Sequence, residues 1–280
     1  MKLGKPQEIL TFSNHIVGAT TSHASQQTLV VANYAWQEFW GYGIEPREGT
    51  LNTNLEWAVG NSPKATFDGG IYAPLWNEVG ARAQVGQVDN LEQRLLYLKN
   101  GGSEIGVARF ADPLTTNKNT LTPEPSLTGI QGEKIDYFII MRNGNLATIE
   151  DFNNPTLRVY SNEGDQLNLI GEQSLAFLTY GLSQPSDNEL MVVVPTQGTY
   201  PLNTKGEPGV YRVPLINDAP GTLQRDTDFD KIELPADIRG LGPVFDDESL
   251  AGYVTTTYGF TRERKDMGNP SKLFYIPVEK

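Results

Sequence analysis

The stretch that decides the fold reads Glu189-Leu190-Met191-Val192-Val193-Val194-Pro195-Thr196 and resumes, after a polar insert, as Val210-Tyr211-Arg212-Val213-Pro214-Leu215. A matching stretch reads Ser249-Leu250-Ala251-Gly252-Tyr253-Val254-Thr255-Thr256 and resumes as Leu273-Phe274-Tyr275-Ile276-Pro277-Val278. Two copies of an apolar strand, a polar excursion and a short second strand indicate a repeated β-unit. We expect each unit to form an antiparallel pair in which alternate residues point inward, namely Val192, Val194, Val213, Val254 and Ile276.

The prolines of these units suggest where the strands lie in their sheets. Pro195, Pro214 and Pro277 have no N–H group for a β-ladder, so their strands should lie at sheet edges or end there. Small sheets with protected outer edges occur when blades are arranged radially. Over residues 175–278 the two units resemble blades of a β-propeller, of the irregular kind found in bacterial and phage proteins. A β-sandwich with two similar long hairpins is the alternative.

Strand patterns also dominate outside the repeat, and helical periodicity is nearly absent. Further strands are predicted at 15–20, 28–33, 135–141, 146–149, 156–160 and 175–180. Residues 88–99 leave two alternatives, a capped helix or a strand that returns over 105–110. The sequence therefore predicts an all-β protein of antiparallel sheets, with less than about 15% helix.

Residues 112–131 differ in composition from the segments around them. They contain five threonines and Pro123-Glu124-Pro125 but no aromatic residue. This stretch separates a Trp-rich β half, 1–111, from a repeat-containing β half, 132–280. It is interpreted as a linker between two halves or as a long surface loop of one continuous domain.

The net charge of −12 excludes several classes of partner. An acidic chain repels phosphate backbones and anionic lipids, so we expect no nucleic-acid binding. No apolar run reaches the roughly 20 residues that span a bilayer, and no signal peptide is visible, so we expect a soluble protein without membrane insertion. The chain has no cysteine, which excludes disulfides and thiolate chemistry and leaves the compartment undecided.

The sharpest local pattern is an alternation of aromatic residues around one acid: Tyr34, Trp36, Glu38, Trp40 and Tyr42. A period of two places all five on one face of a strand. Such a face can be part of the core, an interface with a protein partner, or a platform on which sugar rings stack beside a carboxylate. These residues are the candidate ligand or interface site.

Three alternating acids, Asp226, Asp228 and Asp230, are the candidate metal ligands. Calcium loops of the EF-hand type begin in this way, but they require Gly at the sixth position, where this chain has Lys231. An irregular calcium loop is one interpretation, and a solvated acidic turn is the other. No other cofactor is expected. The histidines His15 and His23 give no convincing metal or Ser-His-Asp site.

The remaining charged motifs assign no catalytic residue. Asp246-Asp247-Glu248 is interpreted as a strand-to-strand turn, although glycosidases also need paired carboxylates. The run Arg262-Glu263-Arg264-Lys265 falls in a polar insert and is interpreted as a solvated loop tip.

The sequence thus predicts a non-catalytic structural or binding protein. The chain has few recognisable catalytic motifs. Its long polar inserts and its aromatic segment favour protein partners or self-assembly, for example as a tail or capsid-accessory subunit of a phage virion. A carbohydrate-active or lactone-hydrolysing enzyme on a β-propeller is the first alternative. A sugar-binding module is the second.

Overall fold

The computed structural model describes residues 1–12, 16–21, 28–33, 38–47, 49–60, 66–67, 86–89, 94–99, 102–110, 120–151, 154–177, 179, 181–194, 207–234, 238–257 and 271–279. Within these ranges there is no α-helix, and the named elements are strands together with the 3-10 turn η3 (Phe229–Lys231). The all-β prediction is therefore confirmed.

The described strands form five sheets, in which neighbouring strands are antiparallel except for the β6–β10 pair. The first contains β2 (Ile16–Thr21), β3 (Thr28–Asn33), β4 (Glu38–Arg47) and β5 (Thr50–Gly60). The second contains β7 (Gly86–Asp89), β8 (Arg94–Lys99), β9 (Glu104–Phe110), β10 (Thr120–Glu124) and β6 (Thr66–Phe67). The third contains β11 (Ile135–Ile140), β12 (Leu146–Glu150), β13 (Thr156–Glu163) and β14 (Gln166–Ser174). The fourth contains β15 (Leu182–Ser186), β16 (Glu189–Val194), β17 (Gly209–Ile216), β18 (Ala219–Pro220) and β19 (Gln224–Arg225). The fifth contains β20 (Ile238–Asp246), β21 (Ser249–Thr257), β22 (Ser271–Pro277) and β1 (Gln7–Phe12).

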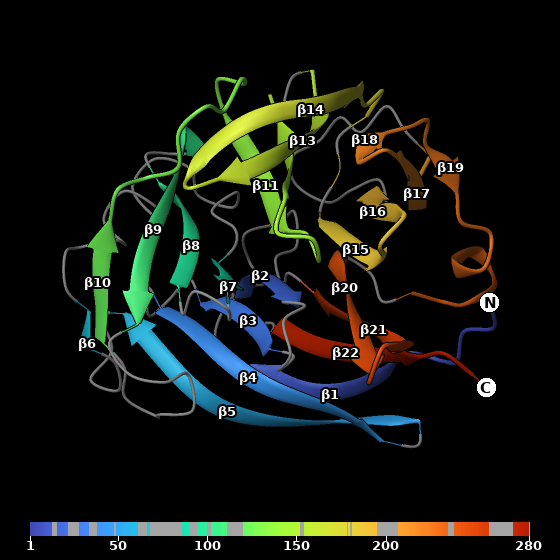
Figure 1. Ribbon diagram of the computed structural model, residues 1–280. Coiled ribbons are helices and arrows are strands. Elements are labelled where there is room, and N and C mark those ends of the chain that lie inside the picture. Colours follow the sequence, from blue (N-terminus) through green and yellow to red (C-terminus); the bar gives the residue numbers. More distant parts are fainter. Residues whose placement is uncertain are drawn as a thin grey trace, which may run out of the picture.

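The five sheets stand in a ring around a central axis (Figure 1). The first strand of each sheet contacts the first strands of its two neighbours, in the cyclic order β2, β7, β11, β15, β20 and back to β2. The ring closes in the fifth sheet, where β1 from the start of the chain pairs with β22 from its end. This arrangement is radial and differs from a sandwich of two facing sheets.

The core lies between neighbouring sheets, and β16 shows why its sequence is apolar at every position. Leu190 and Val192 pack with residues of the third sheet, whereas Met191 and Val193 pack with residues of the fifth. All four side chains are at most 2% exposed. A strand buried on both faces loses the polar–apolar alternation of a half-exposed strand.

The two matching segments occupy equivalent places in their sheets. β16 and β17 form an antiparallel pair, as do β21 and β22, and in both sheets they are the second and third strands. The residues predicted to face inward are all buried, namely Val192, Val194, Val213, Val254 and Ile276. The predicted antiparallel pairs are confirmed, but the buried residues do not share one inward face, since Val254 and Ile276 pack in different core clusters.

The prediction for the prolines is confirmed for Pro277 and wrong for Pro214, which lies inside β17, a strand paired on both sides. β22 ends at Pro277. Outside β17, β19 pairs with 211–212 and β18 with 215–216, so the outer ladder is interrupted at Pro214. Pro195 lies outside the described residues.

Two ambiguous segments are resolved by the pairing. Residues 86–89 and 94–99 are two separate strands, β7 and β8, and β8 pairs with β9, so the strand alternative is confirmed over 94–99. The predicted strand at 175–180 is wrong, because β14 ends at Ser174 and β15 begins at Leu182. Leu175 is buried as part of the connection between two sheets, which explains its apolar character.

Part of the Thr/Pro-rich stretch 112–131 belongs to a sheet. Strand β10 pairs with β9 over Leu121–Glu124, and the Leu127 side chain is buried in the core. Residues 111–119 lie outside the described ranges. The division of the chain into halves 1–111 and 132–280 stays a prediction.

Buried tyrosines give a prediction for alkaline pH. Burial raises the pKa of Tyr42, Tyr97 and Tyr253 from 10 to about 12 in each case. In the unfolded chain these phenols ionise near pH 10, while in the folded protein they stay neutral up to about pH 12. The free energy of unfolding should therefore fall between pH 10 and 12, by up to roughly 1.4 kcal/mol per pH unit for each such tyrosine. Urea denaturation at several pH values, beside a tyrosinate absorbance titration, measures this. Ionisation of every tyrosine near pH 10 in the folded protein would contradict it.

Candidate functional site

Hairpin turns from three neighbouring sheets meet on one face of the ring. In the third, fourth and fifth sheets the turn between the first and second strands lies on this face, and antiparallel pairing puts the turn between the third and fourth strands on the same side. The first-to-second-strand turns are 141–145 between β11 and β12, 187–188 between β15 and β16, and 247–248 between β20 and β21. The third-to-fourth-strand turn 217–218 lies on the same face. We call it the hairpin face.

Turn chemistry explains why the sequence bends at these positions. Gly144 follows Asn143 and has a φ of 86°. Asn217 and Asp218 have φ values of 51° and 63°, and Asp247 has 52°. Gly, Asn and Asp tolerate this left-handed conformation better than other residues, which favours tight hairpin turns at these positions.

Side-chain hydrogen bonds tie the 141–145 turn to the fourth sheet. The side-chain amides of Asn143 and Asn145 donate to Oδ2 of Asp218, at 3.2 and 3.3 Å. The backbone N–H of Arg142 donates to Oε1 of the buried Gln184, at 2.7 Å. The position of Arg142 is thus set by the neighbouring sheet as well as by its own.

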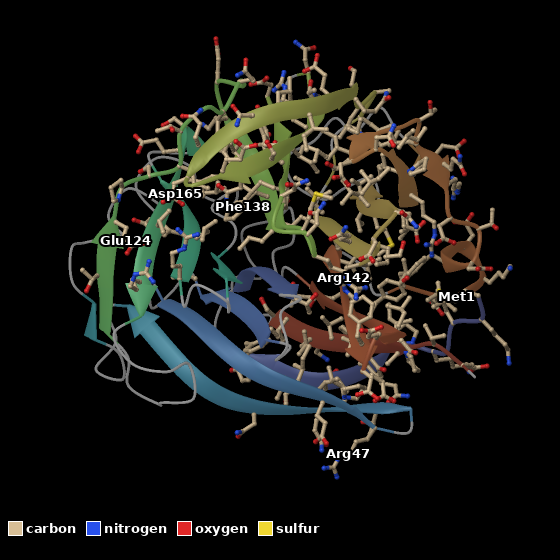
Figure 2. All side chains as sticks on the ribbon, in the orientation of Figure 1. Met1, Arg47, Glu124, Phe138, Arg142 and Asp165 are labelled. Carbon is tan, nitrogen blue, oxygen red and sulfur yellow. The ribbon has the colours of Figure 1, made fainter. Side chains whose placement is uncertain are left out.

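Arg142 reaches across the junction of the fourth and fifth sheets, near the middle of the ring (Figure 2). Its Nε lies 3.2 Å from Oδ1 of Asp187. Its guanidinium carbon lies 5.1 Å from the ring centroid of the buried Phe245, a distance typical of a cation–π contact. One side chain therefore links three sheets.

Beside Arg142 lies a pocket of about 490 Å³, which we call the junction pocket. Its walls come from the fourth and fifth sheets and their turns, from the 141–145 turn, from the N-cap residue of η3, and from the start of the chain. They comprise Met1, Arg142, Pro185, Ser186, Glu189, Arg212, Asp228, Phe245, Glu248 and Leu250. The pocket combines charged side chains of both signs with an apolar patch.

The second arginine of the junction pocket is held from two sides. Nε of Arg212 donates to Oδ2 of Asp226 at 2.6 Å, and Nη1 pairs with Glu189. The side chain of Asp226 is 5% exposed, whereas those of Arg212 and Glu189 are 25% exposed. Asp226 thus anchors the guanidinium from inside, while Glu189 meets it at the pocket wall.

Two further polar groups stand next to this pair. The fully buried Tyr253 hydroxyl lies beside the Arg212 guanidinium, and burial raises its pKa to about 12. Asp228 accepts hydrogen bonds from Nζ of Lys231 and from the amino group of Met1. These bonds lower the pKa of Asp228 from 3.8 to about 2, so the carboxylate is ionised over the whole physiological range.

The predicted aromatic site is described only in part. Tyr34 and Trp36 lie outside the described residues. Glu38, Trp40 and Tyr42 occupy alternate positions of β4, which is the third strand of the first sheet. Tyr42 is half-buried and packs edge-to-face on Phe12 in the core between the first and fifth sheets, with ring centroids 6.3 Å apart. For Tyr42 the ring is therefore part of the core. The use of the other four as a binding surface stays a prediction.

The three aspartates of the predicted metal site pair with cations of the chain itself. Asp226 binds Arg212, Asp228 binds Lys231, and Asp230 accepts two hydrogen bonds from Arg225. Within the described ranges no cluster of three histidine or acidic side chains could hold a metal ion. Each of the three carboxylates therefore pairs with a cation of the chain, and an irregular calcium loop here stays a prediction.

Sequence reasoning missed the junction pocket but not all of its parts. The Asp246-Asp247-Glu248 run does form a turn between two strands, as predicted. No local sequence pattern marks Arg142 or Glu189 as part of a site, because the sequence around a turn does not show which other turns it will contact in the fold. The polar inserts 195–206 and 258–270 lie outside the described residues. The strand ends that they join are on the face opposite the hairpin face.

Comparison with known proteins establishes the fold. No protein-family model and no curated protein matches the chain. Among solved structures, a luciferin-regenerating enzyme matches with a TM-score of 0.54 at 10% identity, over 98% of this chain and 95% of the other. The fold is a β-propeller. The propeller likeness thus extends over nearly the whole chain, and not only over residues 175–278.

Two further solved structures match with TM-scores below 0.5. A gluconolactonase from Xanthomonas campestris has a TM-score of 0.48 at 13% identity, over 99% of this chain and 95% of the other. The Dos1 propeller has a TM-score of 0.41 at 10% identity, over 96% and 73%. At identities this low, structural similarity indicates the fold but does not indicate an activity. In the described part of the propeller, no helix is long and apolar enough to cross a membrane.

Proposed function

We propose that this chain is a non-catalytic β-propeller that binds a protein partner at the junction pocket. The observation that carries the proposal is the convergence of hairpin turns from three blades on one pocket lined by charges of both signs. Turns on a rigid scaffold are where binding residues concentrate. The blades fix the walls of this pocket, so little ordering is required when a partner binds.

The ion pairs of the pocket favour binding over catalysis. A general acid should have a pKa near the working pH. Asp228, with a pKa of about 2, holds no proton to donate at neutral pH. Glu189 is engaged with Arg212, which in turn is anchored by Asp226. These groups present fixed charges to a ligand.

The virion role predicted from the sequence stays a prediction, since the similar structures named above include no virus-particle protein. The two named matches with the highest TM-scores favour another candidate, an enzyme that acts on lactones or carbohydrates. The whole-chain match to the luciferin-regenerating enzyme is the observation in its favour. A sugar-binding role of the aromatic segment is the third candidate.

A pocket-blocking variant separates these candidates. In Ser186→Trp, an indole would fill the junction pocket at the end of β15. We expect the wild-type protein to bind members of a random-peptide array, Ser186→Trp to lose that binding, and Glu133→Gln at the opposite end of the third sheet to keep it. Thermal melts confirm that both variants fold.

Enzyme assays supply the opposing outcome. A panel of lactones and glycosides is incubated with the same three proteins. Turnover of any substrate by the wild type, with peptide binding absent or unaffected by Ser186→Trp, would overturn the proposal in favour of the enzyme.

A further inference from the structure

An asparagine followed directly by glycine lies in the turn between β11 and β12. The chain has two such pairs, Asn100-Gly101 and Asn143-Gly144, and the first lies outside the described residues. All other asparagines of the chain are followed by a residue that carries a side chain. A reaction between the Asn143 side chain and the next backbone nitrogen therefore meets less steric hindrance than at the other described asparagines.

The reaction that such a pair undergoes is deamidation. The backbone nitrogen of the glycine loses its proton to a base in the solvent and attacks the side-chain carbon Cγ of the asparagine. A new N–C bond closes a succinimide ring, and the side-chain nitrogen leaves as ammonia. Water then opens the ring at either carbonyl, which yields an aspartate or an isoaspartate. An amide and a water thus become a carboxylic acid and ammonia, and no oxidant or reductant is needed.

The 141–145 turn presents the reacting groups to solvent. Asn143 and Gly144 are exposed, and a Cβ added to Gly144 would meet no atom within 4 Å. The backbone N–H of Asn145 donates to Oδ1 of Asn143 at 3.1 Å, as in an Asx-turn, and so polarises the carbonyl that is attacked. The N–H of Gly144 donates to the Met141 carbonyl at 2.9 Å, so this one turn hydrogen bond must open before the attack.

The amide that deamidation removes belongs to the link between the third and fourth sheets. Nδ2 of Asn143 donates to Oδ2 of Asp218 at 3.2 Å, and Nδ2 of Asn145 donates to the same oxygen at 3.3 Å. A carboxylate at position 143 has no proton to donate at neutral pH, and it would stand within hydrogen-bond distance of another carboxylate. Like charges at this distance repel each other, so a stabilising contact becomes an unfavourable one.

We propose that Asn143 is a site of spontaneous deamidation in the folded protein, and that the new carboxylate repels Asp218 and weakens the link between the third and fourth sheets. Arg142 belongs to the same turn and to the wall of the junction pocket, so the modification changes the surroundings of that pocket as the protein ages. An isoaspartate product also adds a carbon to the backbone of the turn. The inference goes beyond the proposed function and does not depend on it.

Peptide mapping of the full-length protein tests the chemical step. Trypsin cleaves after Arg142 and Arg158, which isolates residues 143–158 as one peptide. After incubation at mildly alkaline pH, mass spectrometry should find aspartate and isoaspartate in place of Asn143. Asn145 is the internal control: it lies in the same peptide and bonds to the same carboxylate, but a residue with a side chain follows it, so it should keep its amide. Fresh protein digested in parallel gives the baseline.

Two further incubations make the chemical test decisive. The rate should rise with hydroxide concentration, because the attacking nitrogen must lose its proton. Protein unfolded in urea supplies the reference for an unprotected site. If the folded protein shows no conversion at Asn143 by the time the unfolded protein has converted completely, the turn protects the site and the proposal is overturned.

A double-mutant cycle tests the structural consequence. Asn143→Asp reproduces the aspartate product, and Asn143→Ser removes the amide without adding a charge. We expect the midpoint of urea denaturation to fall further in Asn143→Asp than in Asn143→Ser. In the Asp218→Asn background, Asn143→Asp should not lower the midpoint, since the new amide can donate to the carboxylate. Equal midpoints for the Asp and Ser variants, or the same loss in both backgrounds, would overturn the proposed repulsion.

Discussion

Replacing Glu150 by alanine is expected to lower the free energy of unfolding by about 3–5 kcal/mol, because it leaves an arginine next to the core without its innermost carboxylate. The Glu150 side chain is fully buried at the end of β12. Its Oε1 accepts hydrogen bonds from Thr148 at 2.5 Å and from the Tyr160 hydroxyl at 2.8 Å. Its Oε2 accepts from the backbone N–H of Gly132 at 2.7 Å and from Nη1 of Arg158 at 2.6 Å.

These four bonds join a connecting segment to two strands of the third blade. Gly132 lies in the connection between β10 and β11, and no side chain fits there, because an added Cβ would lie 2.1 Å from the Glu150 carboxylate. Loss of the carboxylate would leave the buried hydroxyl of Tyr160 and the Arg158 guanidinium, only 14% exposed, short of partners. Unsatisfied buried polar groups typically cost about 1–3 kcal/mol each.

Glu172 provides a matched control for this prediction. It accepts a hydrogen bond from Nε of the same Arg158 at 2.9 Å, but its side chain is 54% exposed. Exposed ion pairs contribute about 0–1 kcal/mol, so Glu172→Ala should have a small effect. Guanidinium chloride denaturation of both variants makes the comparison. If the free energy of unfolding fell equally in the two variants, or by less than about 1 kcal/mol in Glu150→Ala, the buried network would be no more stabilising than an exposed ion pair.

Local sequence patterns predicted the elements of this fold because each pattern has a local cause. The Asn143-Gly144 hairpin follows from the tolerance of these residues for left-handed backbone, and the apolar runs of β16 and β21 follow from burial between blades. Pro277 ends a strand because it cannot donate to the next ladder bond. Such rules need no knowledge of distant residues.

The candidate site was beyond these rules because its contacts join residues far apart in the chain. Arg142 meets Asp187 and Phe245, which belong to the fourth and fifth blades. The three acids for which the sequence left an irregular calcium loop or a solvated acidic turn open are each paired with an Arg or Lys, which no spacing rule anticipates. Pairing between charged side chains is decided by the fold, and a chain with 34 acids and 22 basic residues offers very many pairs.

Strand β1 was missed for the same reason. Its sequence, QEILTF, is short, and the side chains of its first four residues are exposed or half-buried. Its strand partner β22 lies at the other end of the chain, with Gln7 opposite Tyr275 and Phe12 opposite Ser271. A strand that completes a sheet of the last blade can be recognised only when the ring is known to close.

This closure gives the largest effect that we expect from any change to the chain. Deletion of residues 1–12 should prevent formation of a stable monomer. It removes the outer strand of the fifth blade and takes Phe12, 5% exposed, out of the core shared with Leu29, Val254 and Tyr275. Loss of a buried Phe side chain alone typically costs about 3–5 kcal/mol, which is comparable with the lower end of total domain stability. The unpaired edge of β22 would also be open to pairing with other chains.

Light scattering and circular dichroism of the deletion variant measure this effect, and we expect aggregation or loss of the cooperative melt. Addition of a synthetic peptide of residues 1–12 should restore the monomer, because an added strand can complete a sheet edge through main-chain hydrogen bonds. Thr11→Ala, at an exposed position of the same strand, is the control and should melt as the wild type does. A deletion variant that melts cooperatively as a monomer near the wild-type temperature would show that the ring holds together without β1, through the packing of the first strands around the axis.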